Sequence, residues 1–90
     1  MARQHGRIDT NQPQIVDALR KAGATVAITS DLGHGFSDLV VGYHGTNYLI
    51  ECKHEENELT DDEATFFYNW EGAIAIARTP EEALHVIGAI

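Results

Sequence analysis

The stretch of sequence that decides the fold runs from residue 38 to residue 53 and reads DLVVGYHGTNYLIECK. Residues 38–43 and 48–53 are rich in β-branched and aromatic side chains, which is typical of strands. The four residues between them, His44-Gly45-Thr46-Asn47, are suited to a hairpin turn. The stretch therefore predicts two strands that pair antiparallel.

Three charged side chains stand where this hairpin opens. Residues two apart on a strand point to the same face, so Glu51 and Lys53 project together. With a turn centred on His44-Gly45, Asp38 lies opposite Glu51, and with a turn centred on Gly45-Thr46 it lies opposite Lys53. Either register gathers all three side chains on one face, whereas a loop of three or five residues would separate them.

These residue types suit a metal site. Two converging carboxylates favour Mg²⁺ or Mn²⁺, so we expect Asp38 and Glu51 to be metal ligands and the backbone carbonyl of Cys52 to be a further one. Such an ion can activate water and neutralise charge on a phosphate. Lys53 beside it can orient the water or stabilise developing negative charge. The alternative is an ordinary cross-strand ion pair with Lys53, worth under about 1 kcal/mol if exposed, and spacing alone favours neither interpretation.

The segment before the hairpin predicts a helix and a third strand. The helix has Asn11 as its N-cap, Pro13 in its first turn and Gly23 as its end. Residues 24–29 then form a strand, and residues 30–37 a glycine-containing loop. We expect residues 1–10, which have little apolar content, to be a flexible arm.

The segment after the hairpin predicts a helix, a strand and a last helix. Thr60 and Glu63 form a capping box that opens a helix ending at Gly72. Residues 73–77 form a short buried strand, and Thr79-Pro80 opens the final helix. The sequence therefore predicts one α/β domain over residues 11–90, with a mixed central sheet flanked by helices.

Composition limits the class of protein. The apolar runs are too short to span a bilayer, and the N-terminal residues lack the apolar stretch of a secretory signal. The single cysteine, Cys52, excludes an internal disulfide and a Cys-rich zinc site. We therefore expect a cytoplasmic protein, with Cys52 packed in the core because it points away from Glu51.

The formal net charge of −8 argues against a generic nucleic-acid binder, because non-specific DNA affinity comes from Lys and Arg. However, four of the six cations lie in residues 1–30, and an acidic remainder is compatible with a metal centre. We expect Arg3 and Arg7 to contact DNA phosphates. The alternative is a solvated arm and an acidic surface that favours solubility.

Asp38, followed a dozen residues later by Glu51-x-Lys53, resembles the PD-(D/E)XK nuclease superfamily. Within it, the chain is most similar to phage-type VRR-NUC domains and archaeal-type Holliday junction resolvases, and the resemblance covers nearly all of its length. The further matching segments are Arg7-x-Asp9-x-Asn11, Ile15-Val16-x-Ala18-Leu19-Arg20, Ser30, Gly33-x-Gly35, Leu39-Val40-Val41-Gly42, Leu59-Thr60, Phe66 to Trp70, Gly72 and Glu82-Ala83-Leu84.

The resemblance implies a restriction-endonuclease-like fold and metal-dependent hydrolysis of DNA phosphodiester bonds. It implies Asp38 and Glu51 as ligands of Mg²⁺ or Mn²⁺, Lys53 as the catalytic lysine, and Ser30 as a loop serine near the scissile phosphate. For Ser30 a simple turn-forming role is the alternative. Relatives often cut branched DNA as homodimers in recombination, repair or phage DNA processing, so a bacterial or phage-infected cell is the expected setting.

Two positions depart from the family pattern. Ser37 stands where relatives usually have proline, which shapes the loop and supplies no chemistry. Gln14 stands in the first helix where relatives commonly carry a glutamate near the metal. Its neutral amide can still bind a metal-held water, and Asp9 or Asp17 is an alternative source of the missing acid. A weak or inactive nuclease-like module that binds DNA or a partner protein is therefore the alternative function.

The aromatic residues Phe66, Phe67 and Trp70 recur on one side of the predicted second helix. Their spacing favours core or dimer contacts over stacking on DNA bases. We therefore expect them to be covered by protein.

Overall fold

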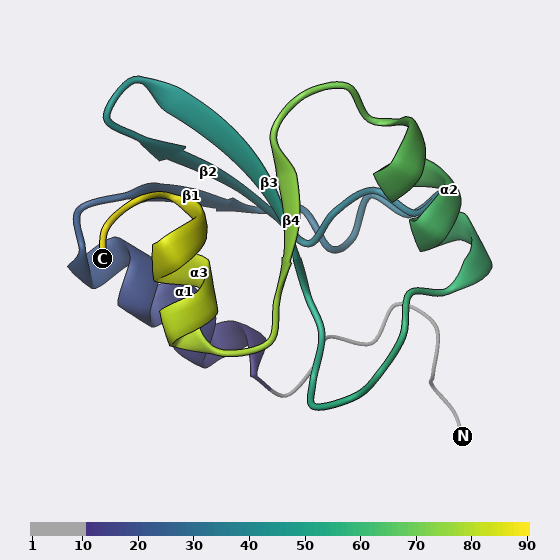
Figure 1. Cartoon of the computed structure of the whole chain (residues 1–90), viewed down its shortest axis with the longest axis horizontal. Helices are drawn as coiled ribbons and strands as arrows, with labels where there is room; N and C mark the ends of the chain where they lie inside the picture. Colours follow the sequence, from purple (N-terminus) through teal and green to yellow (C-terminus); the bar gives the residue numbers. More distant parts are fainter. Residues whose placement is uncertain (1–10) are drawn as a thin grey trace.

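The computed structural model describes residues 11–90, so the expected arm with Arg3, Arg7 and Asp9 lies outside the described residues. The elements follow the predicted α/β order (Figure 1). They are α1 (Gln12–Lys21), β1 (Thr25–Ile28), β2 (Leu39–Tyr43), β3 (Thr46–Cys52), α2 (Asp61–Asn69), β4 (Ile74–Ala77) and α3 (Pro80–Val86). None of the helices in residues 11–90 is long and apolar enough to cross a membrane.

The four strands form one mixed sheet in the order β1-β2-β3-β4. β2 pairs antiparallel with both β1 and β3, and β4 pairs parallel with β3. The predicted mixed sheet is therefore confirmed. Helices α1 and α3 pack against each other on one side of the molecule, whereas α2 lies apart from them beyond β4 (Figure 1).

The hairpin turn consists of His44 and Gly45, whose φ angles are 49° and 81°. A two-residue turn with φ positive at both positions matches the right-handed twist of the strands that it joins. The resulting register pairs Leu39 with Ile50. Continuing it by one residue places Asp38 opposite Glu51, so the first of the two predicted registers is correct.

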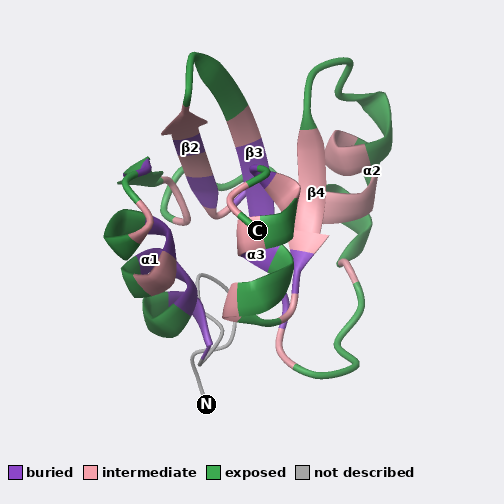
Figure 2. Ribbon diagram, turned by 60° about the vertical axis from the view of Figure 1, so that its left-hand side comes forward, coloured by how far each residue is buried: buried purple, intermediate pink, exposed green. Residues whose placement is uncertain are grey.

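The core lies between the sheet and the pair α1 and α3. Ile50 and Cys52 of β3 are fully buried there with Leu39 of β2, and Figure 2 shows the buried residues concentrated on β2, β3 and the inner side of α1. The predicted core position of Cys52 is confirmed. Because strand side chains alternate, Glu51 and Lys53 project to the opposite face of the sheet.

Two of the three predicted helix caps have the expected hydrogen bonds. Thr60 and Glu63 form the complete capping box of α2, and Thr79 accepts from the Glu82 N–H at the start of α3. Asn11 occupies the N-cap position of α1, but its side chain does not cap the helix. Its Nδ2 instead donates to the carbonyls of Lys53 at 3.1 Å and Arg78 at 2.8 Å. Asn11 therefore ties the start of α1 to the ends of β3 and β4.

The aromatic residues Phe66, Phe67 and Trp70 are not part of the buried core, so the core half of that expectation is wrong, whereas dimer contacts stay a prediction. No residue of α2 is buried, and Trp70 is 42% exposed. The Phe66 ring lies between Phe36, at a centroid distance of 5.0 Å, and Trp70, at 5.2 Å. Because α2 lies away from α1 and α3, its apolar side chains pack on the loop before β2 and not on the core.

The loop before β2 lies close to α2 at Gly35. A Cβ at this position would overlap the backbone carbonyl of Asp62, and φ there is +79°. We expect Gly35→Ala to lower the free energy of unfolding by about 2 kcal/mol or more, because it combines a clash with a strained backbone.

Gly33→Ala is the matched control, because Gly33 has a φ of +76° but open space around its Cβ position. It should cost only about 1 kcal/mol, the strain alone. Urea denaturation followed by circular dichroism measures both variants. Equal losses would show that an added Cβ at Gly35 meets no clash with the Asp62 carbonyl.

Candidate active site

The ends of β2 and β3 bring together the three residues that the sequence pattern singled out. Asp38 immediately precedes β2, Glu51 is the penultimate residue of β3, and Lys53 follows that strand. Glu51 and Lys53 are only 3% and 8% exposed, and Asp38 is half-buried. Two acids and an amine therefore share a largely buried position at one end of the sheet.

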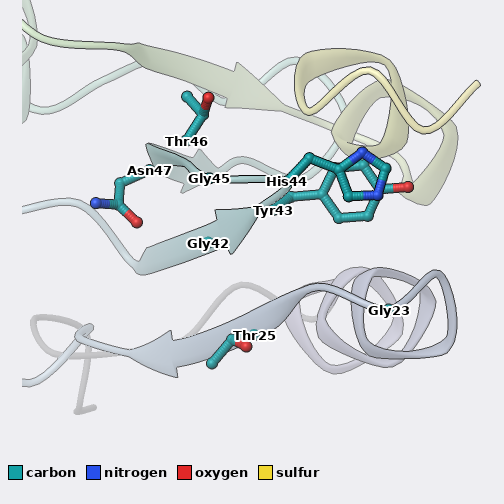
Figure 3. A pocket seen from close by; sticks show the side chains of 8 residues that line it. All are labelled: Gly23, Thr25, Gly42, Tyr43, His44, Gly45, Thr46 and Asn47. Atoms are coloured by element: carbon teal, nitrogen blue, oxygen red, sulfur yellow. The ribbon is translucent and has the colours of Figure 1, made fainter.

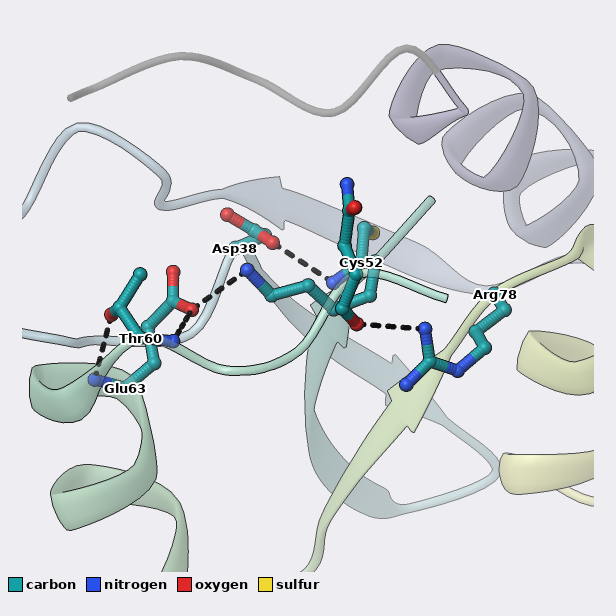
Figure 4. Close-up of polar contacts among 7 residues, drawn as sticks. Asp38, Cys52, Thr60, Glu63 and Arg78 are labelled. Atoms are coloured by element: carbon teal, nitrogen blue, oxygen red, sulfur yellow. Dashed lines mark hydrogen bonds and ion pairs between the residues drawn. The ribbon is translucent and has the colours of Figure 1, made fainter. Parts of the chain in front are cut away.

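Asp38 is held in place by the backbone of the neighbouring strand. Its Oδ2 accepts a hydrogen bond of 2.8 Å from the Cys52 N–H (Figure 4). Its own carbonyl accepts from the Thr29 N–H at 2.7 Å, which continues the pairing of β1 with β2. The carboxylate of Asp38 is therefore fixed beside the strand position from which Glu51 projects.

The carboxyl group of Glu51 lies in an unfavourable place for a negative charge. Burial, the charges of Asp38 and Glu63, and a hydrogen bond to Glu63 raise the pKa of Glu51 to about 9, although the Lys53 ammonium acts in the opposite direction. The carboxyl groups of Asp38, Glu51 and Glu63 can thus carry more negative charge than one lysine ammonium neutralises. A further cation at this point would relieve the repulsion.

Lys53 is paired with a residue that the sequence interpretation did not include. Its Nζ lies 2.7 Å from Oε1 of Glu63 in α2, and the two side chains are 10% and 23% exposed. Burial acts to raise the pKa of Glu63, but hydrogen bonds from Lys53 and Thr60 outweigh it, so this pKa lies below its ordinary value. The ion pair of Lys53 with Glu63 therefore connects the end of the hairpin to α2, an element that the sequence pattern did not link to it.

The glutamine of α1 that is buried is Gln12, whereas Gln14 is exposed. Gln12 Nε2 lies 3.5 Å from Oγ of Ser30, and its Oε1 has no hydrogen-bond partner among residues 11–90. Asp17 is also exposed and pairs with Lys21 at 3.1 Å. Of the polar side chains on α1, Gln12 is therefore the one placed beside Ser30, a predicted site residue.

The donor atoms fit a magnesium or manganese ion bound by few protein ligands. Within residues 11–90 no group of three or more His, Cys, Asp or Glu side chains is arranged to hold a metal. Two carboxylates are nevertheless close enough for the charge of Asp38 to raise the pKa of Glu51. Mg²⁺ keeps several waters and is commonly bound through one or two carboxylates. Asp38 and Glu51 would hold it, and the Cys52 carbonyl stays a predicted further ligand.

The pKa of Glu51 predicts how metal-free stability depends on pH. The folded protein keeps a proton on Glu51 up to about pH 9, whereas the unfolded chain loses it near its ordinary value of 4.5. Without metal, the free energy of unfolding therefore falls as pH rises through this window. Glu51→Gln removes the titrating group, so we expect it to gain on the order of 2 kcal/mol over wild type between about pH 5 and pH 9.

Urea denaturation in the presence of a chelator, at the two pH values, measures this difference. The comparison with Glu51→Gln isolates one carboxyl group, because every other titrating residue is common to both proteins. Parallel pH profiles for the two proteins would contradict the burial of a protonated Glu51.

A separate hollow lies at the other end of the hairpin (Figure 3). Its lining contains no acidic residue and consists of Gly23, Thr25, Gly42, Tyr43, His44, Gly45, Thr46 and Asn47. The hollow lies at the turn end of β2 and β3, whereas Asp38 and Glu51 lie at the opposite end of these strands. It is therefore not part of the candidate active site.

Comparison with known proteins identifies no relative of this chain. No protein-family model, curated protein or solved structure matches the chain. A function therefore has to be inferred from the residues themselves and from their geometry.

Proposed function

We propose that this chain is a metal-dependent, structure-selective DNA endonuclease of the PD-(D/E)XK type, with a restriction-endonuclease-like fold. The observation that supports it best is the meeting of Asp38, Glu51 and Lys53 at one end of the β2–β3 hairpin. The order of helices and strands and the mixed sheet are compatible with this fold. Holliday junctions and related branched DNA are the proposed substrates.

Each of the three residues has a distinct role in the proposed reaction. The carboxylates of Asp38 and Glu51 would hold Mg²⁺ or Mn²⁺, and the ion would supply water activation and offset charge on the phosphate. The ammonium of Lys53 stabilises negative charge that develops on the phosphate, and its burial strengthens this effect because little water screens it. Ser30, held beside Gln12, is proposed to contact the phosphate.

The cations of the described residues contribute little further affinity for DNA. Across residues 11–90, Lys53 pairs with Glu63 and Lys21 pairs with Asp17. Arg20 donates to the Val26 carbonyl, and Arg78 donates to the carbonyls of Glu55 and Asn57. Since these groups are already engaged, we propose that Arg3 and Arg7 provide phosphate contacts and that a homodimer presents two such sets to one junction.

A weak or inactive module that binds DNA or a partner protein is the second candidate. The observations that favour it are the net charge of −8 and the neutral Gln14 in the helix where PD-(D/E)XK nucleases commonly carry an acid. Metal titration discriminates the two functions, because the module would show no metal binding that depends on Asp38 and Glu51.

The test of the proposed function is a cleavage assay with a synthetic four-way DNA junction and a linear duplex of matched sequence. We expect cutting of the junction in Mg²⁺, slower cutting of the duplex, and none of either in a chelator. Wild-type protein that cuts neither DNA in Mg²⁺ or Mn²⁺ would contradict the nuclease assignment.

A further inference from the structure

Glu63 links the first turn of α2 to the lysine of the candidate active site. Its Oε1 accepts from Nζ of Lys53 at 2.7 Å and from the backbone N–H of Thr60 at 2.9 Å. Figure 4 shows both contacts converging on this one carboxylate oxygen. The capping box that starts α2 therefore also fixes the partner of Lys53.

The start of α2 is itself held against the body of the protein. The Asp62 carbonyl lies so close to Gly35 that a Cβ there would overlap it. One turn further along, the Phe66 ring makes an edge contact with Phe36 of the same loop. That loop leads directly into Asp38. The same loop therefore contacts α2 and positions an acid of the candidate site.

A buried lysine at this place needs a carboxylate that the metal does not use. Lys53 is 8% exposed, and an uncompensated buried charge is strongly unfavourable. Asp38 and Glu51 would share their charge with the bound cation, whereas Glu63 lies 2.7 Å from the Lys53 ammonium and can balance its charge. A lysine side chain is also long and flexible, and an ion pair reduces the number of conformations that it samples.

We propose that Glu63 is a positioning residue: its ion pair holds the Lys53 ammonium beside Asp38 and Glu51, the proposed metal ligands. This inference rests on the proposed nuclease function for its effect on catalysis, although the restraint on Lys53 can be measured without it. In this proposal Glu63 acts through Lys53 and is not itself a metal ligand, although its carboxylate also hydrogen-bonds Glu51.

Two variants separate this role from the capping of α2. Glu63→Gln keeps the cap, because glutamine at this position also completes a capping box, but it removes the negative charge beside Lys53. Thr60→Ala is the matched control, since it deletes the hydroxyl that caps Glu63 N–H and leaves the carboxylate in place. The alanine variant should lower the stability of α2 by about 1 kcal/mol.

In cleavage of the four-way junction, we expect Glu63→Gln to lower kcat about 10- to 100-fold, because a misplaced catalytic group loses rate steeply with distance. KM for the junction should stay within about threefold of wild type. Thr60→Ala should keep kcat within about twofold. Equal losses of kcat in the two variants would assign Glu63 a merely structural role and overturn the proposal.

Nuclear magnetic resonance tests the restraint on Lys53 directly and without DNA. The two Hε protons of a held lysine side chain have different chemical shifts, which become equal when the side chain rotates freely. We expect separate Hε signals for Lys53 in wild type and in Thr60→Ala, and merged signals in Glu63→Gln.

The two proposals fail in different ways. If wild type cuts no DNA while the Lys53 signals merge in Glu63→Gln, the nuclease function is wrong and the restraint on Lys53 stands. If Lys53 gives the same signals in wild type and in Glu63→Gln, the positioning role is overturned whatever the cleavage assay shows.

Discussion

Replacing Lys53 with alanine should lower the rate of junction cleavage at least about 100-fold while the metal ion still binds. Removing one preorganised group that stabilises developing negative charge commonly costs this much. The effect should be large here because Lys53 is 8% exposed, so little solvent is available to take over its role. Single-turnover cleavage in saturating Mg²⁺ measures the rate without a contribution from product release.

Two further variants make this result specific. Lys53→Met keeps most of the side-chain stem that packs in the site, so it should be as slow as Lys53→Ala but lose less stability. Lys21→Ala removes an exposed lysine that pairs with Asp17 on α1, and its cleavage rate should match wild type. A Lys53→Ala protein that cuts as fast as wild type would show that the lysine has no catalytic role.

The second large effect is the loss of metal binding in Asp38→Asn and in Glu51→Gln. Each variant keeps the shape of the side chain and replaces one proposed charged ligand with a neutral amide. We expect the affinity for Mn²⁺ to fall by about 100-fold or more. Mutations of residues that only hydrogen-bond a metal ligand typically cost about 10- to 100-fold. In Asp38→Asn the amide oxygen can still accept from the Cys52 N–H, so the fold should be retained.

Isothermal titration calorimetry with Mn²⁺ measures both affinities. Asp31→Asn is the control, because Asp31 is an exposed acid in the loop before β2. Like any isolated surface carboxylate, it should bind metal only weakly. Its titration should match wild type. Unchanged Mn²⁺ affinity in Asp38→Asn and Glu51→Gln would place the metal elsewhere or exclude it.

The hairpin illustrates what the sequence could and could not predict. Period-two alternation is a local property, so it correctly placed Glu51 and Lys53 on one face and Cys52 in the core. The register was open between two turns because Gly45 belongs to both candidates. The observed turn requires positive φ at His44, a residue type that signals this conformation less strongly than asparagine or glycine.

The two glutamines of α1 show how helix phase decides which side chain reaches a site. Gln12 lies on the buried stripe with Ile15, Val16 and Leu19, at the spacing of one helix face. Gln14 is two residues further and therefore points to the opposite side, into solvent. The apolar spacing in the sequence already contained this information, whereas the family resemblance directed attention to Gln14.

Glu63 could not have been assigned to the site from its sequence position. Its place three residues after Thr60 is fully explained by the capping box, which leaves no unexplained feature to interpret. Its contact with Lys53 depends on where α2 docks, and that docking is set by a loop glycine and an aromatic pair distant in the sequence. Long-range contacts of this kind produce no periodic pattern in the sequence from which they could be predicted.

The most direct test of the central claim is a crystal soaked in Mn²⁺ and measured for anomalous scattering. The geometry of the hairpin predicts one strong peak within bonding distance of a carboxylate oxygen of Asp38 and one of Glu51, with Lys53 still paired to Glu63. Saturating Mn²⁺ that gives no peak between these two acids would contradict a metal-dependent mechanism at this site.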